Sequence, residues 1–513
     1  MATIDVPPEM APFVRRLNTD PNDYEANKAI ASFLCYQAET LPQSIEFFAR
    51  ALSQNRTNDP DHKPMLESFS RALIYIGDFA EAIKPLRLLL TLYDPDLKYL
   101  YHLAQASFRT GQVDIVNDAA KEIVERFYAF AEKLAERSGE PLTQILMPSN
   151  ILQSHYGELA AKLDLYAKAK ILCLTPDVRT LLPVLEDEVV NRCLYVSLRH
   201  SISDVIEFPS SAEERDSWEE RHPRCLVSAD YYVDPDGRGL EMNQFYVLVQ
   251  RKWEESGRGP LVKLPDKYID AGWGLLRNRG LPEDGWFVSI HARCGGFRPD
   301  SVTSGLTYHR NSRIENYLPA IKAIRERGGW VVRLGDSSMP PLPEMEGVID
   351  YAHADWREDW IDVFFLAQNR FFVGVPSGPN AVAQMFQVPM VCVNWFPFED
   401  WPAPSRTIVI FKRYCRTDDG SGLTVEEMAN PPVRGLFSKD AFDSKGIEVI
   451  ENSPEEILDA VTEMMDRCDG LIEYTAEDEN LQQRFRAAGD PFKVGVNIRI
   501  GRSFLNRHRS LLG

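Results

Sequence analysis

The chain has 513 residues, a length that suggests about three domains. Of these residues 44% are hydrophobic and 26% are charged, which is typical of a soluble globular protein. Its formal net charge of −19 would repel a phosphate backbone or an anionic lipid surface, which excludes nucleic-acid or membrane binding as the main activity. No stretch is apolar for long enough to span a membrane, and no secretory leader is visible, so a cytoplasmic location is expected. The eight cysteines form no Cys-x-x-Cys pair, as expected of reduced thiols in that compartment.

Residues 1–135 are predicted to form a domain of repeated helical pairs. Gly77 and Gly111 each separate an apolar helix from an amphipathic one, and the two glycines lie 34 residues apart. An earlier, less regular unit covers residues 23–53. This pattern resembles the tetratricopeptide (TPR) repeat, although a plain helical bundle is the alternative. The resemblance implies a docking surface for a protein, or a scaffold that makes the chain a homodimer.

Residues 142–275 are predicted to form a first α/β lobe, because short apolar runs alternate there with helical patterns. Its predicted strands are residues 143–147, 171–174, 193–198 and 225–233, and its predicted helices are residues 157–170 and 177–189. A polar, glycine-rich stretch at 254–260 marks the approach to the end of this lobe.

Residues 276–470 show the same alternation more clearly and are predicted to form a second α/β lobe. Its predicted strands are residues 286–291, 330–334, 371–375, 390–394 and 407–411, and its predicted helices are residues 313–327, 359–368 and 379–387. Residues 471–513 are predicted to be a C-terminal helical tail. The predicted fold class is therefore α plus α/β, in which helical repeats precede two doubly wound lobes with a cleft between them.

Residues suited to a diphosphate follow the predicted strands of the second lobe. Ligands bind beyond the carboxyl ends of strands in doubly wound sheets. The residues at those ends are His291, Arg293, Arg333, Gly335, Asp336, Ser377, Gly378, Asn380 and Asn394. Arginine offers forked donors to phosphate oxygens, and the start of the helix near Asn380 adds backbone N–H groups.

Each of these residues also has a structural alternative. Ser377 could cap the helix that follows it. Arg333 could form an ion pair with Asp336 or Asp350, and His291 could be a core histidine. The prediction of a donor site depends on all of these residues meeting at one edge of one sheet.

Several motifs resemble a family of bacterial glycosyltransferases that accompany surface-carbohydrate genes. The resemblance covers residues 142–513, and its motifs are Val288–Arg293, Tyr308–Tyr317, Trp330–Asp336, Phe372–Pro379, Val388–Asn394 and Ile500–Leu505. It implies a two-lobed GT-B fold of two Rossmann-like domains and a nucleotide-sugar donor. More distantly, the His-x-Arg pair is similar to that of GT-B fucosyltransferases, which implies that Arg293 binds the donor phosphate and takes part in catalysis. Cys294-Gly295-Gly296 departs from the fucosyltransferase pattern, so the donor is left open.

The first lobe is expected to face the acceptor, and His155 or Glu158 could act there as the base of an inverting transfer. In the structural alternative, Glu158 is a first-turn residue favoured by the helix dipole. Asp234-Pro235-Asp236-Gly237 could hold a metal, but a Pro-Asp-Gly turn is the favoured interpretation, so neither a metal nor another cofactor is expected. The expected activity is glycosyl transfer to a protein or surface-glycan acceptor. A non-catalytic adaptor with degenerate lobes is the alternative.

Overall fold

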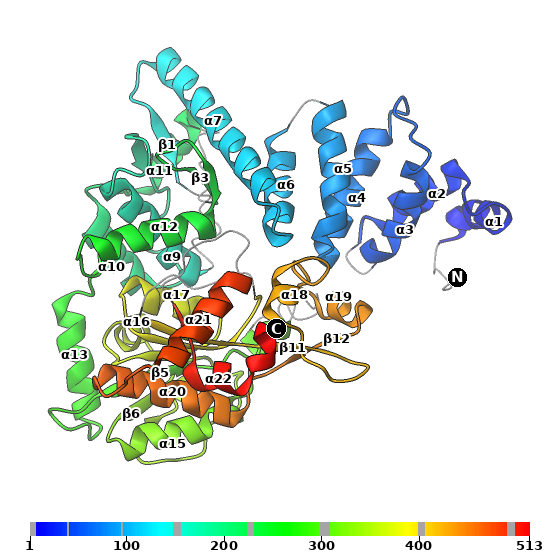
Figure 1. Ribbon diagram of the computed structural model, residues 1–513. Coiled ribbons are helices and arrows are strands. Elements are labelled where there is room, and N and C mark those ends of the chain that lie inside the picture. Colours follow the sequence, from blue (N-terminus) through cyan, green and yellow to red (C-terminus); the bar gives the residue numbers. More distant parts are fainter. Residues whose placement is uncertain are drawn as a thin grey trace.

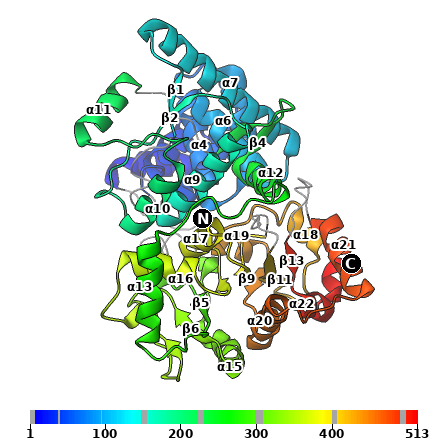
Figure 2. The same cartoon turned by 90° about the vertical axis from the view of Figure 1, so that its left-hand side faces the viewer.

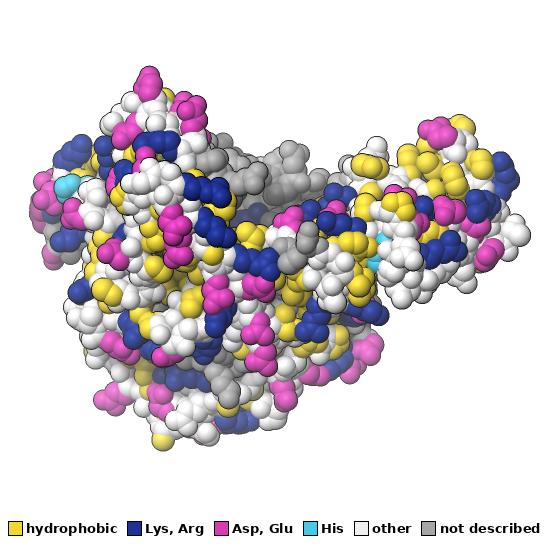
Figure 3. Space-filling model, turned by 90° about the horizontal axis from the view of Figure 1, so that it is seen from above, with side chains coloured by type: hydrophobic (Ala, Val, Ile, Leu, Met, Phe, Trp, Pro, Cys, Tyr) yellow, Lys and Arg dark blue, Asp and Glu magenta, His cyan; other side chains and the backbone are white. Residues whose placement is uncertain are grey.

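The computed structural model describes residues 7–37, 40–93, 96–146, 155–222, 230–297, 308–398, 406–489 and 498–513. The chain forms a helical domain, which projects to one side as an arm, and two lobes that lie one above the other (Figures 1, 2 and 3). No helix among the described residues is both long enough and apolar enough to cross a membrane.

The helical domain is a row of helices in which each helix packs against the next one in the chain. Its elements are η1 Pro8–Met10, α1 Ala11–Thr19, α2 Tyr24–Leu34, α3 Leu41–Leu52, α4 His62–Ile76, α5 Phe79–Leu92, α6 Leu97–Arg109 and α7 Val113–Ser138. Gly77 ends α4 with a φ of 82°, and the Asp78 carboxylate then accepts a hydrogen bond from the backbone N–H of Glu81 to start α5. The predicted helical pairs are confirmed, whereas their membership of the TPR family stays a prediction.

The first lobe contains more helix and less sheet than predicted. Its elements are β1 Thr143–Ile145, α9 Tyr156–Ile171, β2 Arg179–Leu181, α10 Arg192–Ile202, α11 Ala212–Arg221, β3 Tyr231–Val233, β4 Gly239–Glu241 and α12 Met242–Glu255. Strands β1 and β2 are parallel, and β3 and β4 form an antiparallel hairpin. Within the described part of this lobe, these two small sheets replace the single doubly wound sheet that was expected.

Three predicted elements of the first lobe are wrong. Residues 171–174 end α9 and form a turn, residues 193–198 lie inside α10, and residues 177–189 contain β2 in place of a helix. The Asn191 side chain caps α10 by accepting a hydrogen bond of 2.8 Å from the Leu194 N–H, so an apolar run that resembled a strand starts a helix. Met147 and residues 225–229 of the predicted strands lie outside the described residues.

The second lobe is built on a seven-stranded parallel sheet with the order β13-β10-β9-β8-β5-β6-β7. Its strands are β5 Phe287–His291, β6 Trp330–Arg333, β7 Val348–Ile349, β8 Phe372–Gly374, β9 Met390–Trp395, β10 Thr407–Phe411 and β13 Arg499–Ile500. All five predicted strands are present. The predicted helical tail also supplies β13, which completes one edge of the sheet.

Helices cover both faces of this sheet, as the buried strands require. The helices are α15 Leu318–Glu326, α16 Asp359–Ala367, α17 Gly378–Met385, α20 Pro454–Cys468, α21 Ala476–Gly489 and α22 Arg502–Arg507, and α13 Asp266–Arg277 leads into the lobe from above. Between β10 and α20 the chain forms β11 Arg413–Arg416, α18 Val425–Ala429, α19 Lys439–Ser444 and β12 Ile447–Ile450. Short 3-10 turns are η2 Gly295–Phe297, η3 Tyr308–Arg310, η4 Ile314–Tyr317, η5 Tyr351–His353 and η6 Arg509–Leu512.

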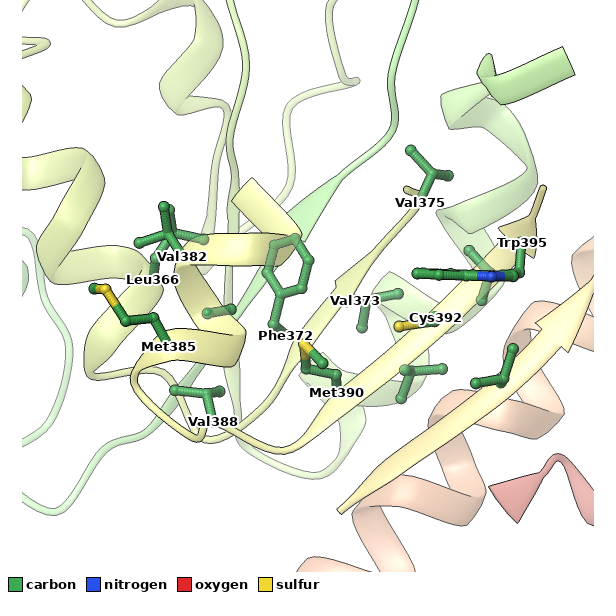
Figure 4. Packing of buried hydrophobic residues seen from close by; sticks show 14 of the residues in the cluster. Leu366, Phe372, Val373, Val375, Val382, Met385, Val388, Met390, Cys392 and Trp395 are labelled. Atoms are coloured by element: carbon green, nitrogen blue, oxygen red, sulfur yellow. The ribbon is translucent and has the colours of Figure 1, made fainter. Parts of the chain in front are cut away.

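The core of the second lobe explains why its strands were predictable. Phe372, Val373 and Met390 are fully buried between the sheet and its helices. Phe372 lies on the side of Val382 and Met385 of α17, whereas Val373 lies beside Cys392 of β9 (Figure 4). Continuous apolar runs of this kind are typical of strands that are covered on both faces.

The helical domain contacts both lobes. Tyr231 of the first lobe packs in one buried cluster with Ala120 and Ile123 of α7. On the second lobe, Arg434 donates a hydrogen bond of 3.1 Å to the carbonyl of Phe108 in α6. The Ser438 hydroxyl likewise donates a hydrogen bond of 3.2 Å to the carbonyl of Ile76 in α4. The helical domain therefore bridges the two lobes.

Candidate functional site

The carboxyl ends of β5 and β8 bring His291 and Ser377 together. The Ser377 hydroxyl and His291 Nδ1 are 3.2 Å apart and share a hydrogen bond. Ser377 stands at the N-cap position of α17, but its side chain makes no capping hydrogen bond there. His291 is only 7% exposed, and burial together with nearby Arg333 lowers its pKa to about 4. The imidazole is therefore neutral at pH 7. It positions the Ser377 hydroxyl through their hydrogen bond but adds no positive charge to the site.

Two arginines lie at the same edge of the sheet. Arg293 donates from Nη1 to the side-chain carbonyl of Asn311. Arg310 donates from Nε and Nη2 to the carbonyl of Pro376, at 3.1 and 2.7 Å, immediately before the start of α17. Arg310 was not among the predicted site residues, and its position became evident only from this contact. The N-terminus of α17 thus has two guanidinium groups in its neighbourhood.

A buried lysine joins this cluster. Lys412 follows β10 directly, is 3% exposed, and donates a hydrogen bond of 2.8 Å from Nζ to the carbonyl of Asn311. Burial lowers the pKa of Lys412 to about 8; Glu451 acts in the opposite direction, and Arg313 adds to the decrease. Asn311 therefore contacts Lys412 through its backbone and Arg293 through its side chain. Sequence reasoning missed Lys412, although its place after a predicted strand was the signal that could have found it.

Arg333 lies beneath this edge rather than on its surface. It is 1% exposed, its Nη1 pairs with Asp350 at 2.9 Å, and its Nη2 donates to the carbonyl of Pro340. Arg333 therefore forms the ion pair with Asp350 that was predicted as the alternative to a contact with the donor. Asp336 accepts a hydrogen bond of 2.9 Å from the N–H of Ser338, in the turn that begins at Gly335. Direct contact of Arg333, Gly335 or Asp336 with a donor stays a prediction.

Asn394 supports the loop that carries Arg293. Its side-chain carbonyl accepts a hydrogen bond of 2.7 Å from the backbone N–H of Asn452, and its own N–H donates to the Asn452 side chain at 2.6 Å. Its Nδ2 donates to the Ser312 hydroxyl at 2.8 Å, and the Ser312 N–H donates to the Arg293 carbonyl at 2.9 Å. Fully buried Asn394 therefore positions the Arg293 loop from below.

Asn380 is also buried, inside α17. Its side-chain carbonyl accepts a hydrogen bond of 3.4 Å from the Cys392 thiol on β9. The side chain thus faces the sheet, and only the backbone of Asn380 belongs to the start of the helix. A side-chain contact between Asn380 and a donor stays a prediction.

The predicted acceptor-side residues meet the predicted donor-side residues where α9 packs against α17. A Cβ atom added to Gly157 would lie 2.6 Å from the Cα of Gly378, so the two helix N-termini are in direct contact. His155 is exposed at the N-cap position of α9, and Glu158 in its first turn pairs with Lys162 at 3.4 Å. One helix N-terminus from each lobe therefore takes part in this contact.

This arrangement suits an anion. Helix N-termini attract negative charge through their free N–H groups and their dipoles. Here two such termini lie beside the edge that carries Arg293, Arg310 and Lys412. The charge of this edge is therefore complementary to a group with two or more negative charges, such as a diphosphate.

The Asp234–Gly237 segment forms a turn. Asp234 Oδ1 accepts hydrogen bonds from the N–H groups of Asp236 and Arg238, at 3.1 and 2.9 Å. These contacts close the β3–β4 hairpin, as the turn interpretation predicts. Across the described ranges, no three His, Cys, Asp or Glu side chains are grouped so as to hold a metal ion.

No protein-family model matches the sequence, and no curated protein matches it. Solved structures with a loosely similar chain path include a glycosyl transferase family 9 protein from Veillonella parvula. It is 11% identical over 63% of this chain and 97% of its own, with a TM-score of 0.34. The ADP-heptose lipopolysaccharide heptosyltransferase II of E. coli is 14% identical over 64% of this chain and 99% of its own, with a TM-score of 0.35. The dodecameric iron-containing glycosyltransferase TibC of enterotoxigenic E. coli is 13% identical over 52% of this chain and 61% of its own, with a TM-score of 0.30.

Proposed function

We propose that the chain is a glycosyltransferase of the GT-B type that binds a nucleotide-sugar donor between its two lobes. The observation that carries this proposal is the meeting of α9 and α17 at Gly157 and Gly378, beside the cationic edge of the second lobe. A donor diphosphate placed there would contact the second lobe while its sugar faced the first. The three solved structures are too loosely similar to add support, so the proposal depends on this geometry.

The proposed reaction is a single displacement at the anomeric carbon of the sugar. A base removes the proton from the acceptor hydroxyl, and the acceptor oxygen forms a bond to that carbon. The bond from the carbon to the diphosphate oxygen breaks, and its electron pair leaves with the nucleotide. Arg293, Arg310, Lys412 and the N-terminus of α17 stabilise the charge on the leaving group, which is the largest electrostatic requirement of the step. The anomeric configuration is inverted.

Two residues of the first lobe are candidates for the base. His155 is the residue immediately before α9, and Glu158 is in the first turn of that helix. Both are at the end of α9 that contacts α17. General-base catalysis contributes about 10²–10⁴-fold, so replacing the true base should lower kcat by that factor. We expect one of His155→Ala and Glu158→Gln to do so with nucleotide binding unchanged. Equal, near-wild-type rates for both variants would remove the two residues from the reaction.

The donor site is tested by thermal unfolding in the presence of nucleoside diphosphates and CMP, because a ligand that binds only the folded state raises the unfolding temperature. We expect one diphosphate to stabilise the protein. Arg293→Ala should weaken its binding by about 1.5–3 kcal/mol, the contribution of a charged hydrogen bond. Arg277→Ala is the matched control, because that exposed arginine lies in α13, before the amino end of β5, and pairs with Glu283 at 3.0 Å. Equal binding by both variants would contradict the assignment of Arg293.

Transfer is expected to need no metal, because cationic side chains stand at the proposed diphosphate site. Activity measured before and after treatment with EDTA tests this expectation. Loss of activity that Mg²⁺ or Mn²⁺ restores would revive Asp234 and Asp236 as metal ligands, and would require their turn to open.

The acceptor is proposed to be a protein that docks on the helical domain, with a surface glycan as the alternative. A docked protein would have a raised local concentration at the transfer site without new contacts to the sugar. If no nucleotide stabilises the chain and no donor is hydrolysed, the non-catalytic adaptor would replace the enzyme as the better explanation.

A further inference from the structure

Helix α7 runs beside the first lobe (Figure 1). A cavity lies between them. Its volume is about 520 Å³, which is within the usual range for ligand pockets. Side chains from α6, α7, α9 and β3, together with residues 173–176, form its walls. Five tyrosines line it: Tyr101, Tyr128, Tyr166, Tyr231 and Tyr232. The proposed transfer reaction uses none of them.

Three of the five tyrosine hydroxyls make hydrogen bonds to other protein groups, so the cavity offers mainly aromatic carbon. Tyr128 donates to the side chain of Gln144 at 3.2 Å, and Tyr231 donates to the carbonyl of Tyr101 at 3.1 Å. The Tyr166 hydroxyl lies 2.8 Å from that of Thr180. Apolar and aromatic groups bury favourably against such walls.

The charged residues that line the cavity all have the same sign. Glu125, Glu132 and Asp234 belong to the described lining, which includes no lysine, arginine or histidine. Glu125 and Glu132 are exposed on α7. Glu125 also pairs with Lys121 at 3.8 Å and Asp234 with Arg238 at 3.3 Å, so Glu132 is the main source of negative charge. A phosphate or a lipid diphosphate would meet no cationic side chain in this lining, whereas a positive charge beside an apolar group would be attracted by Glu132.

We infer that this cavity binds the acceptor as a peptide segment, by taking in an apolar or aromatic side chain that stands next to a lysine or arginine. The inference rests on the proposed function, because it names the class of acceptor for the proposed transfer site. The charge and the apolar walls together select a basic, hydrophobic stretch of protein over a lipid-linked glycan.

The cavity and the transfer site are connected through α9. Asp230, the residue before cavity-lining Tyr231, pairs with Lys162 at 2.8 Å, and Lys162 pairs with Glu158. Along α9, Tyr166 lies eight residues beyond Glu158, or about 12 Å at 1.5 Å per residue. An extended peptide advances about 3.3 Å per residue. The modified residue of the acceptor should therefore lie about four residues from the side chain that occupies the cavity.

Fluorescence anisotropy on the full chain tests the inference with two labelled glycine–serine peptides. Each carries one tryptophan, flanked by lysines in one peptide and by glutamates in the other. The lysine peptide should bind about tenfold more tightly, since charge complementarity sets the preference. Glu132→Lys should reduce that preference, and Ala129→Trp should block binding by filling the cavity from an exposed position on α7. Glu136→Lys, a similar exposed change on α7 outside the lining, should bind both peptides as the wild type does.

The inference is overturned if the two peptides bind equally, if Ala129→Trp binds them normally, or if farnesyl diphosphate competes with the lysine peptide. Nucleotide-dependent thermal stabilisation of the same variants separates this result from the proposed function. Peptide binding without any nucleotide binding would overturn the proposed glycosyl transfer and leave a peptide-binding cavity. Nucleotide binding with no selective peptide binding would overturn only the acceptor inference.

Discussion

The charged form of Lys412 is energetically unfavourable in its buried position unless an anion lies nearby. Burying an ammonium group removes its hydration, and among the described residues the Asn311 carbonyl together with the field of Glu451 only partly replaces it. A bound diphosphate would supply the missing negative charge. The low pKa of Lys412 is thus explained if the lysine is there to receive a ligand.

This explanation predicts a pH dependence for nucleotide binding. Lys412 carries its charge below its pKa of about 8 and loses it as the pH rises through that value. The dissociation constant of the nucleotide should therefore increase above pH 8. Lys412→Met should bind more weakly at pH 7 and lose this dependence. Calorimetric titrations at several pH values between 6.5 and 9.5 measure both effects.

Lys412→Arg is the control for this prediction, because arginine stays protonated over the whole range. Its binding should be flat with pH wherever the variant folds as the wild type does. A pH profile in Lys412→Arg that matches the wild type would show that another group is responsible.

Single residues were predictable from the sequence where a motif ended a strand, and unpredictable where a distant partner decided their role. His291, Arg293 and Ser377 meet at one sheet edge as expected. Asn394 also stands there, but its side chain is held by Asn452, 58 positions away in the chain. No local sequence pattern predicts the pairing of Asn394 with Asn452. The role of Asn394 beneath the Arg293 loop could therefore be found only from the structure.

At the scale of elements, the contact between α9 and α17 depends on two glycines. Gly157→Ala would place a methyl group 2.6 Å from the Cα of Gly378, and backbone cannot yield as a flexible side chain can. We expect this change to destabilise the protein by about 1–3 kcal/mol, as other insertions into packed contacts do. It should also weaken nucleotide binding, because the two helix N-termini would move apart. Urea unfolding and nucleotide titration measure the two effects.

Gly274→Ala, in α13, is the matched control for the glycine contact. No atom lies within 4 Å of the added Cβ there, so the change should be neutral or stabilise the helix by up to about 1 kcal/mol. If Gly157→Ala behaves as Gly274→Ala does, the close contact of the two helices is not needed for stability or for binding.

The two lobes differed in how far their elements could be predicted. In the second lobe each strand is an apolar run covered on both faces, and helical patterns separate the runs, so periodicity alone was enough. In the first lobe, residues 193–198 are equally apolar but follow the capping residue Asn191 and form α10. Residues 177–189 include Pro183, which has no N–H to donate to a helix. In the first lobe, therefore, the helix cap at Asn191 and Pro183 compete with the apolar periodicity.

At the scale of the whole molecule, the helical domain is part of the folded core as well as a projecting arm. Helix α7 covers β3 and β4, while α4 and α6 contact residues 434–438 of the second lobe. The outer helices, α1–α3, share their main buried cluster with α4 and lie farther out along the arm (Figure 1). The arm therefore has an inner part that ties the lobes together and an outer part that does not.

Two truncations distinguish these parts. Removing residues 1–135 would delete most of α7, expose Tyr231 and its neighbours to water, and break the contacts at Phe108 and Ile76. That truncated chain should unfold at a clearly lower temperature and lose stabilisation by nucleotide. Removing residues 1–60 leaves α4–α7 and both sets of lobe contacts in place. Because repeat units interact mainly with their nearest neighbours, this shorter truncation should keep nucleotide-dependent stabilisation and donor hydrolysis. It is therefore the better variant for asking whether the outer arm docks a protein acceptor, and equal thermal unfolding of the two truncated chains would show that the inner helices do not tie the lobes together.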